Sequence, residues 1–229
     1  MDIVLVAGLW LTRSVWDNVC DELANRGHRP LPVALPGVDD GSTAATLTDQ
    51  LDAVLEAVDT ANRPMVVGHS AACTLAWMAA DRRPDTINSL VLIGGFPGSD
   101  GEAYADFFAT TDGVMPFPGW DPFEGPDAAD LDGPTRSNIE SVAVPVPESV
   151  AKGIVSLTDE RRFDVPLLLV CPEYTPDHAR AWIEAGDVPE LSRAKGIAYV
   201  DIDTGHWPMV TQPAELARIL NDATGGIQP

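Results

Sequence analysis

The sequence GHSAA at residues 68–72 contains the strongest candidate for a catalytic nucleophile. An apolar run over 64–68 precedes it and a helical pattern follows from about Ala71, so Ser70 lies where a strand turns into a helix. The pattern G-x-S-x-G marks such a turn, in which small neighbours let a strained backbone expose the serine hydroxyl; here Ala72 replaces the last glycine. Serine is also a favoured helix N-cap, so the rest of the chain must decide between the two roles.

A nucleophilic serine needs a base, and the chain has only four histidines. His28 precedes a predicted strand at the edge opposite the carboxyl ends, His69 lies inside the turn and points away from its neighbour, and His178 falls on a predicted helix. His206 follows the last predicted strand, in DTGHWPM, which places it at the carboxyl edge where α/β active sites form. A loop histidine near a chain end is usually only solvated, but together with GHSAA we expect His206 to be the base.

Short apolar runs alternate with longer amphipathic ones along the chain, which is typical of a parallel sheet joined by crossover helices. The runs are nearly continuous in apolar residues, so both faces of the strands should be covered. The sequence therefore predicts an α/β fold. The predicted strands are 3–6, 28–36, 64–68, 89–95, 165–171 and 197–203, and the predicted helices are 14–27, 46–61, a segment from about 71, and 213–223.

The alternation breaks between residues 97 and 164. Residues 99–141 carry ten acidic side chains against one base, Arg136, together with six aromatic residues and frequent proline and glycine. A structureless loop this long is uncommon in a compact domain, and disordered acidic linkers are poor in aromatics. We expect 97–164 to form a small inserted cap on a single domain whose core comprises 1–96 and 165–229; a disordered linker is the alternative.

The composition restricts the partners and the compartment. The 229 residues include 14 Lys and Arg against 35 Asp and Glu, and the net charge of −21 disfavours binding to nucleic acid or to an anionic membrane. The sequence contains no apolar stretch of about 18 residues, the length needed to span a membrane. The apolar run 3–11 follows Asp2, whereas the apolar run of a signal peptide follows basic residues. Cys20, Cys73 and Cys171 form no CxxC pair. We expect a soluble, cytoplasmic protein.

Motifs for metals and nucleotides are absent from the sequence. HExxH, the P-loop pattern and GxGxxG do not occur, and the glycine-rich GGFPGSDG misses the dinucleotide spacing. The sequence therefore indicates no metal and no cofactor, with a small-molecule substrate as the partner. It predicts no oligomeric state.

These residues give the chain a resemblance to the α/β-hydrolase superfamily over nearly its whole length. The matching stretches are LVAGLW, LPG, VVGHSAA, LVLIGG, PLLLVC and GHWPMVTQPAELA, and the order, with the nucleophile early and the base last, agrees. The chain starts at what is usually the family's third strand, as in compact esterases similar to plant methyl-ester hydrolases and hydroxynitrile lyases. The resemblance implies an α/β-hydrolase fold with Ser70 as nucleophile and His206 as base.

The resemblance also implies two backbone donors for an oxyanion. In the family, the residue after a His-Gly pair at the first strand end donates its N–H. The pair here reads Ala7-Gly8, so the role falls to Leu9, and the N–H of Ala71 joins it. The helix that follows Ala71 adds the positive end of its dipole.

The acid that would complete a triad with Ser70 and His206 is less clearly indicated by the sequence. The family position of the acid, about four residues past the strand 165–171, falls on Thr175, which carries no charge. Glu173 is the preferred candidate because its longer side chain can start nearer the strand end. The alternatives are Asp177, Asp100, Asp203 and the absence of an acid.

The expected activity is hydrolysis of a neutral, largely apolar carboxylic ester or lactone through an acyl-serine, with apolar walls from Trp10 and Trp207. Amide or C–C bond hydrolysis would use the same groups. One alternative is a ligand-binding protein on a hydrolase scaffold. A hydroxynitrile lyase is a further alternative, disfavoured because those lyases have a lysine directly after the base, where this chain has Trp207.

Overall fold

Six parallel strands form the centre of the computed structural model, which describes residues 1–227. They are β1 (Asp2–Val6), β2 (Arg29–Pro32), β3 (Met65–His69), β4 (Ser89–Ile93), β7 (Leu167–Cys171) and β8 (Ile197–Asp201), and a separate antiparallel pair comprises β5 (Val114–Met115) and β6 (Val146–Pro147). The sheet order is β2-β1-β3-β4-β7-β8, and every neighbouring pair in it is parallel. The predicted parallel sheet is confirmed.

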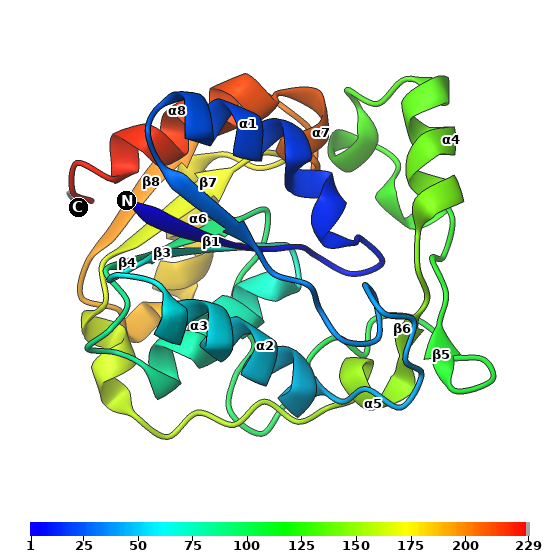
Figure 1. The fold of residues 1–229 in the computed structure, drawn as a ribbon, viewed down its shortest axis with the longest axis horizontal. Coiled ribbons are helices and arrows are strands. Elements are labelled where there is room, and N and C mark those ends of the chain that lie inside the picture. The colour runs from blue at the N-terminus through cyan, green and yellow to red at the C-terminus, as the bar shows by residue number, and fades with distance from the viewer. Residues whose placement is uncertain (228–229) are drawn as a thin grey trace.

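Helices cover both faces of this sheet (Figure 1). They are α1 (Asp17–Asn25), α7 (Pro208–Thr211) and α8 (Pro213–Ala223) on one face and α2 (Leu47–Thr60), α3 (Ala72–Arg82) and α6 (Pro176–Ala185) on the other. Two further helices, α4 (Gly133–Val142) and α5 (Glu148–Ala151), lie beside the sheet in the segment between β4 and β7. Ile3 and Leu5 of β1 pack in one core with α1 and α8, whereas Val4 and Val6 pack in the other with α2 and α3, as the alternation of a strand requires. Among residues 1–227, no helix is both long and apolar enough to cross a membrane.

The edges of the sheet differ from the sequence predictions. The central strands β3, β4 and β7 are buried throughout, but the edge strand β8 is only partly buried and ends at the exposed Asp201. The predicted strand over 28–36 is reduced to the four residues of β2. The predicted helix over 14–27 begins as a short 3-10 turn at Arg13–Trp16 and becomes α-helical only at Asp17.

Two prolines leave the outer edge of β2 without N–H groups for a further strand. Arg29 and Val33 donate their N–H groups to the carbonyls of Met1 and Leu5 at 2.9 Å, so odd-numbered residues of this segment face β1. Because neighbouring residues of a strand point their N–H groups to opposite sides, those of residues 30 and 32 would point away from the sheet. Both positions are proline, which has no N–H to offer to another strand.

Residues 97–164 lie between β4 and β7 and hold only short elements, including β5, β6, α4 and α5. Two hydrogen bonds fasten this segment to Trp10, which follows β1: the indole Nε1 donates to the Met115 carbonyl at 3.1 Å, and the Val144 N–H donates to the Trp10 carbonyl at 2.9 Å. The inserted segment therefore packs against the carboxyl end of the sheet.

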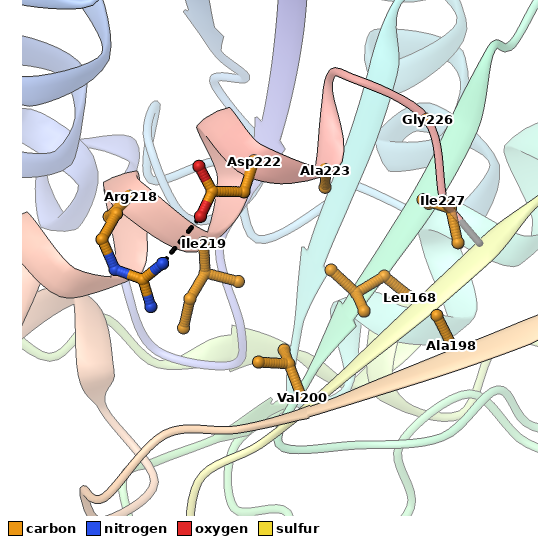
Figure 2. Close-up of a pocket in the computed structure, with 9 residues that line it drawn as sticks. All are labelled: Leu168, Ala198, Val200, Arg218, Ile219, Asp222, Ala223, Gly226 and Ile227. Carbon is orange, nitrogen blue, oxygen red and sulfur yellow. Dashed lines mark hydrogen bonds and ion pairs between the residues drawn. The ribbon is translucent and has the colours of Figure 1, made fainter. Parts of the chain in front are cut away.

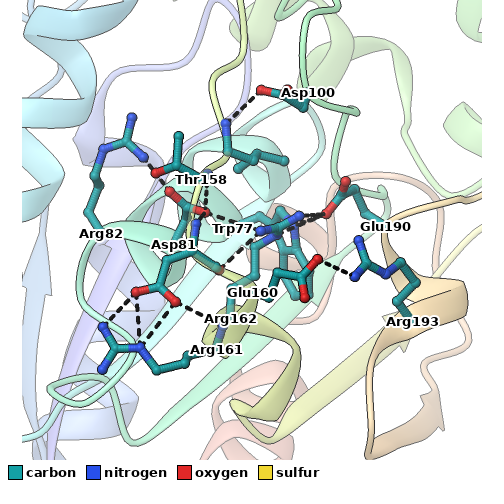
Figure 3. A network of polar contacts seen from close by, with 12 residues as sticks. Trp77, Asp81, Arg82, Asp100, Thr158, Glu160, Arg161, Arg162, Glu190 and Arg193 are labelled. Carbon is teal, nitrogen blue, oxygen red and sulfur yellow. Dashed lines mark hydrogen bonds and ion pairs between the residues drawn. The ribbon is translucent and has the colours of Figure 1, made fainter.

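A buried ionic network ties the end of the inserted segment to α3 (Figure 3). Asp81 of α3 accepts hydrogen bonds from the N–H groups of Thr158 and Asp159 at 2.7 and 2.8 Å. Arg162 lies between Asp81 and Glu190, at 3.2 and 2.9 Å, and its side chain is 5% exposed. Each buried charge thus has an opposite partner, and α3 is fixed at the end remote from Ser70.

Candidate active site

Ser70 occupies the sharp turn that the sequence predicts between β3 and α3. Its φ of +56° lies in the left-handed region, which is unfavourable for residues other than glycine. The Ser70 N–H donates to the Ile93 carbonyl of β4 at 2.8 Å, which holds the turn against the neighbouring strand. A Cβ on Gly68 would overlap the backbone oxygen of Ala72, and one on Gly95 would lie 2.6 Å from the Ser70 oxygen. The turn is therefore possible only with glycine at both positions.

His206 and Glu173 form a hydrogen-bonded pair at the carboxyl ends of β8 and β7. Nδ1 of His206 lies 2.8 Å from Oε1 of Glu173, and the two side chains are 12% and 14% exposed. A carboxylate can only accept, so Nδ1 carries the proton and Nε2 is left free to accept one. Oε2 of Glu173 is buried with no hydrogen-bond partner among residues 1–227.

The other candidate acids lie elsewhere. Asp177 is paired with Arg180 at 2.7 Å on the surface of α6, and its side chain is 92% exposed. Asp100 accepts a hydrogen bond from the Leu157 N–H at 2.8 Å, and Asp203 is exposed. Thr175, where the family pattern expects the acid, accepts from the His178 N–H at 3.2 Å and caps α6.

Two consecutive glycines lie between the serine and the His206–Glu173 pair. A Cβ on Gly94 would lie 3.2 Å from Nδ1 of His206, while Gly95 contacts the Ser70 backbone. The three candidate residues therefore meet around one short backbone segment after β4. Ser70 Oγ and His206 Nε2 are not hydrogen-bonded to each other within residues 1–227, and such bonds are often long before substrate binds.

The proposed oxyanion donors flank the serine. Gly8 packs so closely that an added Cβ would lie 3.0 Å from the Ser70 Cβ, which brings Leu9 beside the turn. Ala71 is the N-cap of the eleven-residue helix α3. Neither the Leu9 nor the Ala71 N–H has a hydrogen-bond partner among residues 1–227, so both donors are unoccupied.

The cavity beside Ser70 has a volume of about 360 Å³. Its walls come from the turn, from the glycine-rich segment after β4 and from the start of the inserted segment: Ser70, Ala71, Thr74, Gly94, Gly95, Phe96, Pro97, Gly98, Glu102, Ala103, Tyr104 and Phe107. Trp10 and Trp207, the expected apolar walls, do not line it. They are 6% and 4% exposed and both pack against Phe123 of the inserted segment.

A smaller apolar pocket of about 190 Å³ lies between β7, β8 and α8 (Figure 2). Leu168, Val200 and Ile219 line it, and its charged side chains, Arg218 and Asp222, are paired with each other at 2.7 Å. It contains no candidate nucleophile or base. Within residues 1–227, no three His, Cys, Asp or Glu side chains gather as metal ligands would.

Two contacts to the His206 backbone were not expected from the sequence. His69 Nε2 lies 2.7 Å from the His206 carbonyl oxygen, and the Asp127 carbonyl of the inserted segment accepts the His206 N–H at 2.7 Å. Burial, followed by the nearby Glu173 carboxylate, raises the pKa of Asp127. The only sequence signal for the first contact is the histidine type next to Ser70; the second joins distant segments through backbone atoms and leaves no signal.

Comparison with known proteins shows the family of the chain. The family model described as "Alpha/beta hydrolase family" matches residues 3–219, so the chain belongs to the alpha/beta hydrolase family. Membership of this family supports a hydrolase. No curated protein matches the chain in sequence.

Several solved structures share the fold at low sequence identity. An extracellular α/β-hydrolase from a Paenibacillus species, described as sharing structural and functional homology with tobacco salicylic acid binding protein 2, has a TM-score of 0.80 at 18% identity, covering 97% of this chain and 98% of its own. A pyrethroid hydrolase from Sphingobium faniae JZ-2 has a TM-score of 0.71 at 18% identity, with 99% and 98% covered. An Arabidopsis methylesterase has a TM-score of 0.72 at 14% identity, with 98% and 99% covered.

Proposed function

We propose that the chain is a serine hydrolase that cleaves a carboxylic ester or lactone, with Ser70 as nucleophile, His206 as base and Glu173 as the acid that orients the base. The observation that carries the proposal is the 2.8 Å contact between Glu173 and His206, next to a serine held at φ +56°. A strained serine that lines a cavity, together with an oriented imidazole, is the arrangement needed to activate a hydroxyl.

The reaction follows from these groups in two halves. Ser70 Oγ attacks the ester carbonyl carbon while His206 Nε2 takes the hydroxyl proton, and the N–H groups of Leu9 and Ala71 bind the oxyanion. The C–O bond then breaks, His206 returns the proton to the leaving alcohol, and the acyl group stays on Ser70. Water, deprotonated by His206, then attacks the acyl carbon, the bond to Ser70 Oγ breaks, and His206 returns its proton to that oxygen, which releases the carboxylic acid and free Ser70.

The proposed substrate is neutral and largely apolar. Phe96, Tyr104 and Phe107 line the cavity together with glycines, Glu102 is its one acidic side chain, and the net charge of −21 disfavours anions. Two fold neighbours are named as a pyrethroid hydrolase and a methylesterase, which agrees with ester chemistry. We further propose that 97–164 acts as a cap and that the protein, with three free cysteines, acts in the cytoplasm on small molecules.

A serine-directed fluorophosphonate tests the proposal. The wild-type protein should be labelled at Ser70 and should hydrolyse a panel of p-nitrophenyl esters of graded acyl length. Ser70→Ala should do neither and should still fold, because a Cβ of the same size occupies the same turn. Faster cleavage of a succinyl half-ester than of its uncharged analogue at low salt would contradict the neutral substrate. Absence of both labelling and hydrolysis in the wild type would favour a ligand-binding protein on the same scaffold.

A further inference from the structure

His69 is buried directly against the backbone of the residue that we propose as the base. His69 is 1% exposed, and the centroid of its ring lies 4.9 Å from that of the His206 ring. Nε2 of His69 is 2.7 Å from the His206 carbonyl oxygen. His69 is also the neighbour of Ser70 in the chain, so one rigid side chain joins the turn that carries the nucleophile to the loop that carries the base.

The chemistry of this contact fixes the state of the imidazole. A carbonyl oxygen can only accept, so Nε2 of His69 carries the proton. Nδ1 has no partner within residues 1–227, and Gly8 covers it so closely that a Cβ there would lie 2.9 Å away. Burial, with His206 as the second cause, lowers the pKa of His69 to about 3, against the opposing effect of its bond to the carbonyl. His69 is therefore a neutral donor at neutral pH and does not repel an imidazolium at His206.

Both polar backbone groups of His206, the N–H and the carbonyl, have hydrogen-bond partners. Its N–H donates to the Asp127 carbonyl of the inserted segment at 2.7 Å, and its carbonyl oxygen lies 2.7 Å from Nε2 of His69. Gly205, just before it, packs so tightly that any Cβ would overlap the Asp127 oxygen. Glu173 fixes the ring, and within residues 1–227 His69 is the one side chain hydrogen-bonded to the His206 backbone.

We propose that His69 is a positioning residue: its Nε2–H bond to the His206 carbonyl sets the distance between the base and Ser70. The inference rests on the proposed function, because it concerns the placement of the proposed base. His69 does not touch the substrate in this account, since it does not line the cavity beside Ser70. A small displacement of a catalytic group is enough to slow a reaction by about 100-fold.

Two substitutions separate the hydrogen bond from the packing. His69→Leu keeps a side chain of similar bulk and removes the donor, and should lower kcat for a p-nitrophenyl ester by roughly 10- to 100-fold with little change in KM. His69→Gln places an amide N–H near the position of Nε2, and should recover most of this loss. His28→Leu is the matched control, because His28 makes a comparable side-chain bond to Asn221, 3.0 Å away, far from Ser70. It should keep the wild-type kcat.

A kcat for His69→Leu within twofold of the wild type would overturn the proposal, as would an equal loss in the leucine and glutamine variants. If the leucine variant does not fold, His69→Asn replaces it, because the shorter amide cannot reach the carbonyl. Melting temperatures measured alongside separate loss of rate from loss of folded protein.

A readout that needs no turnover separates this proposal from the proposed function. The proton shared by His206 Nδ1 and Glu173 should give a downfield NMR resonance in the wild type. The resonance should broaden or disappear in His69→Leu and persist in His69→Gln. Its persistence in the leucine variant, or its loss in both, would overturn the positioning role. A wild type that hydrolyses no ester would refute the proposed function and leave this test intact.

Discussion

Glu173 and His206 face each other across the carboxyl ends of two paired strands, with Oε1 of one 2.8 Å from Nδ1 of the other. Cys171 of β7 is in register with Asp201 of β8, so Glu173 begins two residues beyond one strand and His206 five residues beyond the next. The longer arm of glutamate closes the gap that an aspartate at this position would leave. This contact identifies the carboxylate whose removal should affect His206, the proposed base.

Glu173→Gln should lower kcat for ester hydrolysis by roughly 10² to 10⁴. The amide keeps the shape of the side chain but removes the charge that stabilises an imidazolium at His206, and it can also favour the wrong tautomer of the ring. The effect should appear in kcat, measured at saturating ester concentration, with a melting temperature close to that of the wild type.

Asp177→Asn provides the comparison, because Asp177 is exposed and paired only with Arg180. This variant should keep a wild-type kcat. A wild-type rate in Glu173→Gln together with a collapse in Asp177→Asn would transfer the role of the acid to Asp177.

The sequence predicted the parts of the site that depend on local pattern. The central strands and the turn at Ser70 follow from apolar runs and small residues that are adjacent in the chain, and the structure has them where expected. The contact of Glu173 with His206 depends on which strands are neighbours and on side-chain reach, so the sequence left four carboxylates open. Trp10 and Trp207 were expected as pocket walls because they flank site residues, but their indoles pack against Phe123 of the inserted segment.

The edges of the sheet were less predictable for a related reason. An apolar pattern indicates a strand but not whether a second strand pairs with it. β2 therefore ends at Pro32, although the apolar pattern continues, and β8 is partly exposed because it has one neighbour.

Gly68→Ala should disrupt the turn at Ser70. A Cβ at this position overlaps the backbone of Ala72, which cannot rotate away as a flexible side chain could, so either the end of β3 or the start of α3 must move. We expect loss of fluorophosphonate labelling and a destabilisation of about 1–3 kcal/mol, typical of overpacking, measured by urea unfolding.

Gly133→Ala is the matched glycine control. An added Cβ at Gly133 meets nothing within 4 Å, and the residue lies in the first turn of α4. It should label normally and gain up to about 1 kcal/mol, because alanine restricts the unfolded chain. Equal labelling of both variants would show that the turn tolerates a side chain at Gly68.

Replacing Pro30 and Pro32 together by valine should promote self-association. The change creates two outward N–H groups and raises β-propensity at the open edge of β2, where another strand could then pair. Concentration-dependent growth in apparent mass by size-exclusion chromatography with light scattering would be the result expected. Leu31→Val is the control, since its N–H faces β1. A strictly monomeric double variant would mean that charge repulsion, with a net charge of −21, already protects this edge.

His69 should make the protein sensitive to acid. Its pKa is lowered from an ordinary 6.5 to about 3 by burial, so the unfolded chain takes up a proton at this residue below pH 6.5 while the folded protein does not. The free energy of unfolding should therefore fall by up to about 1.4 kcal/mol per pH unit between pH 6.5 and 3 because of this one group. Above pH 6.5, His69 should contribute nothing to the pH dependence of the free energy of unfolding.

His69→Gln keeps a neutral donor and cannot take up the proton, so its stability, measured by urea unfolding across this range, should decline less steeply than that of the wild type. Parallel pH dependence in the wild type and His69→Gln would mean that the imidazole is protonated in the folded protein, and its bond to the His206 carbonyl would then be that of a cation.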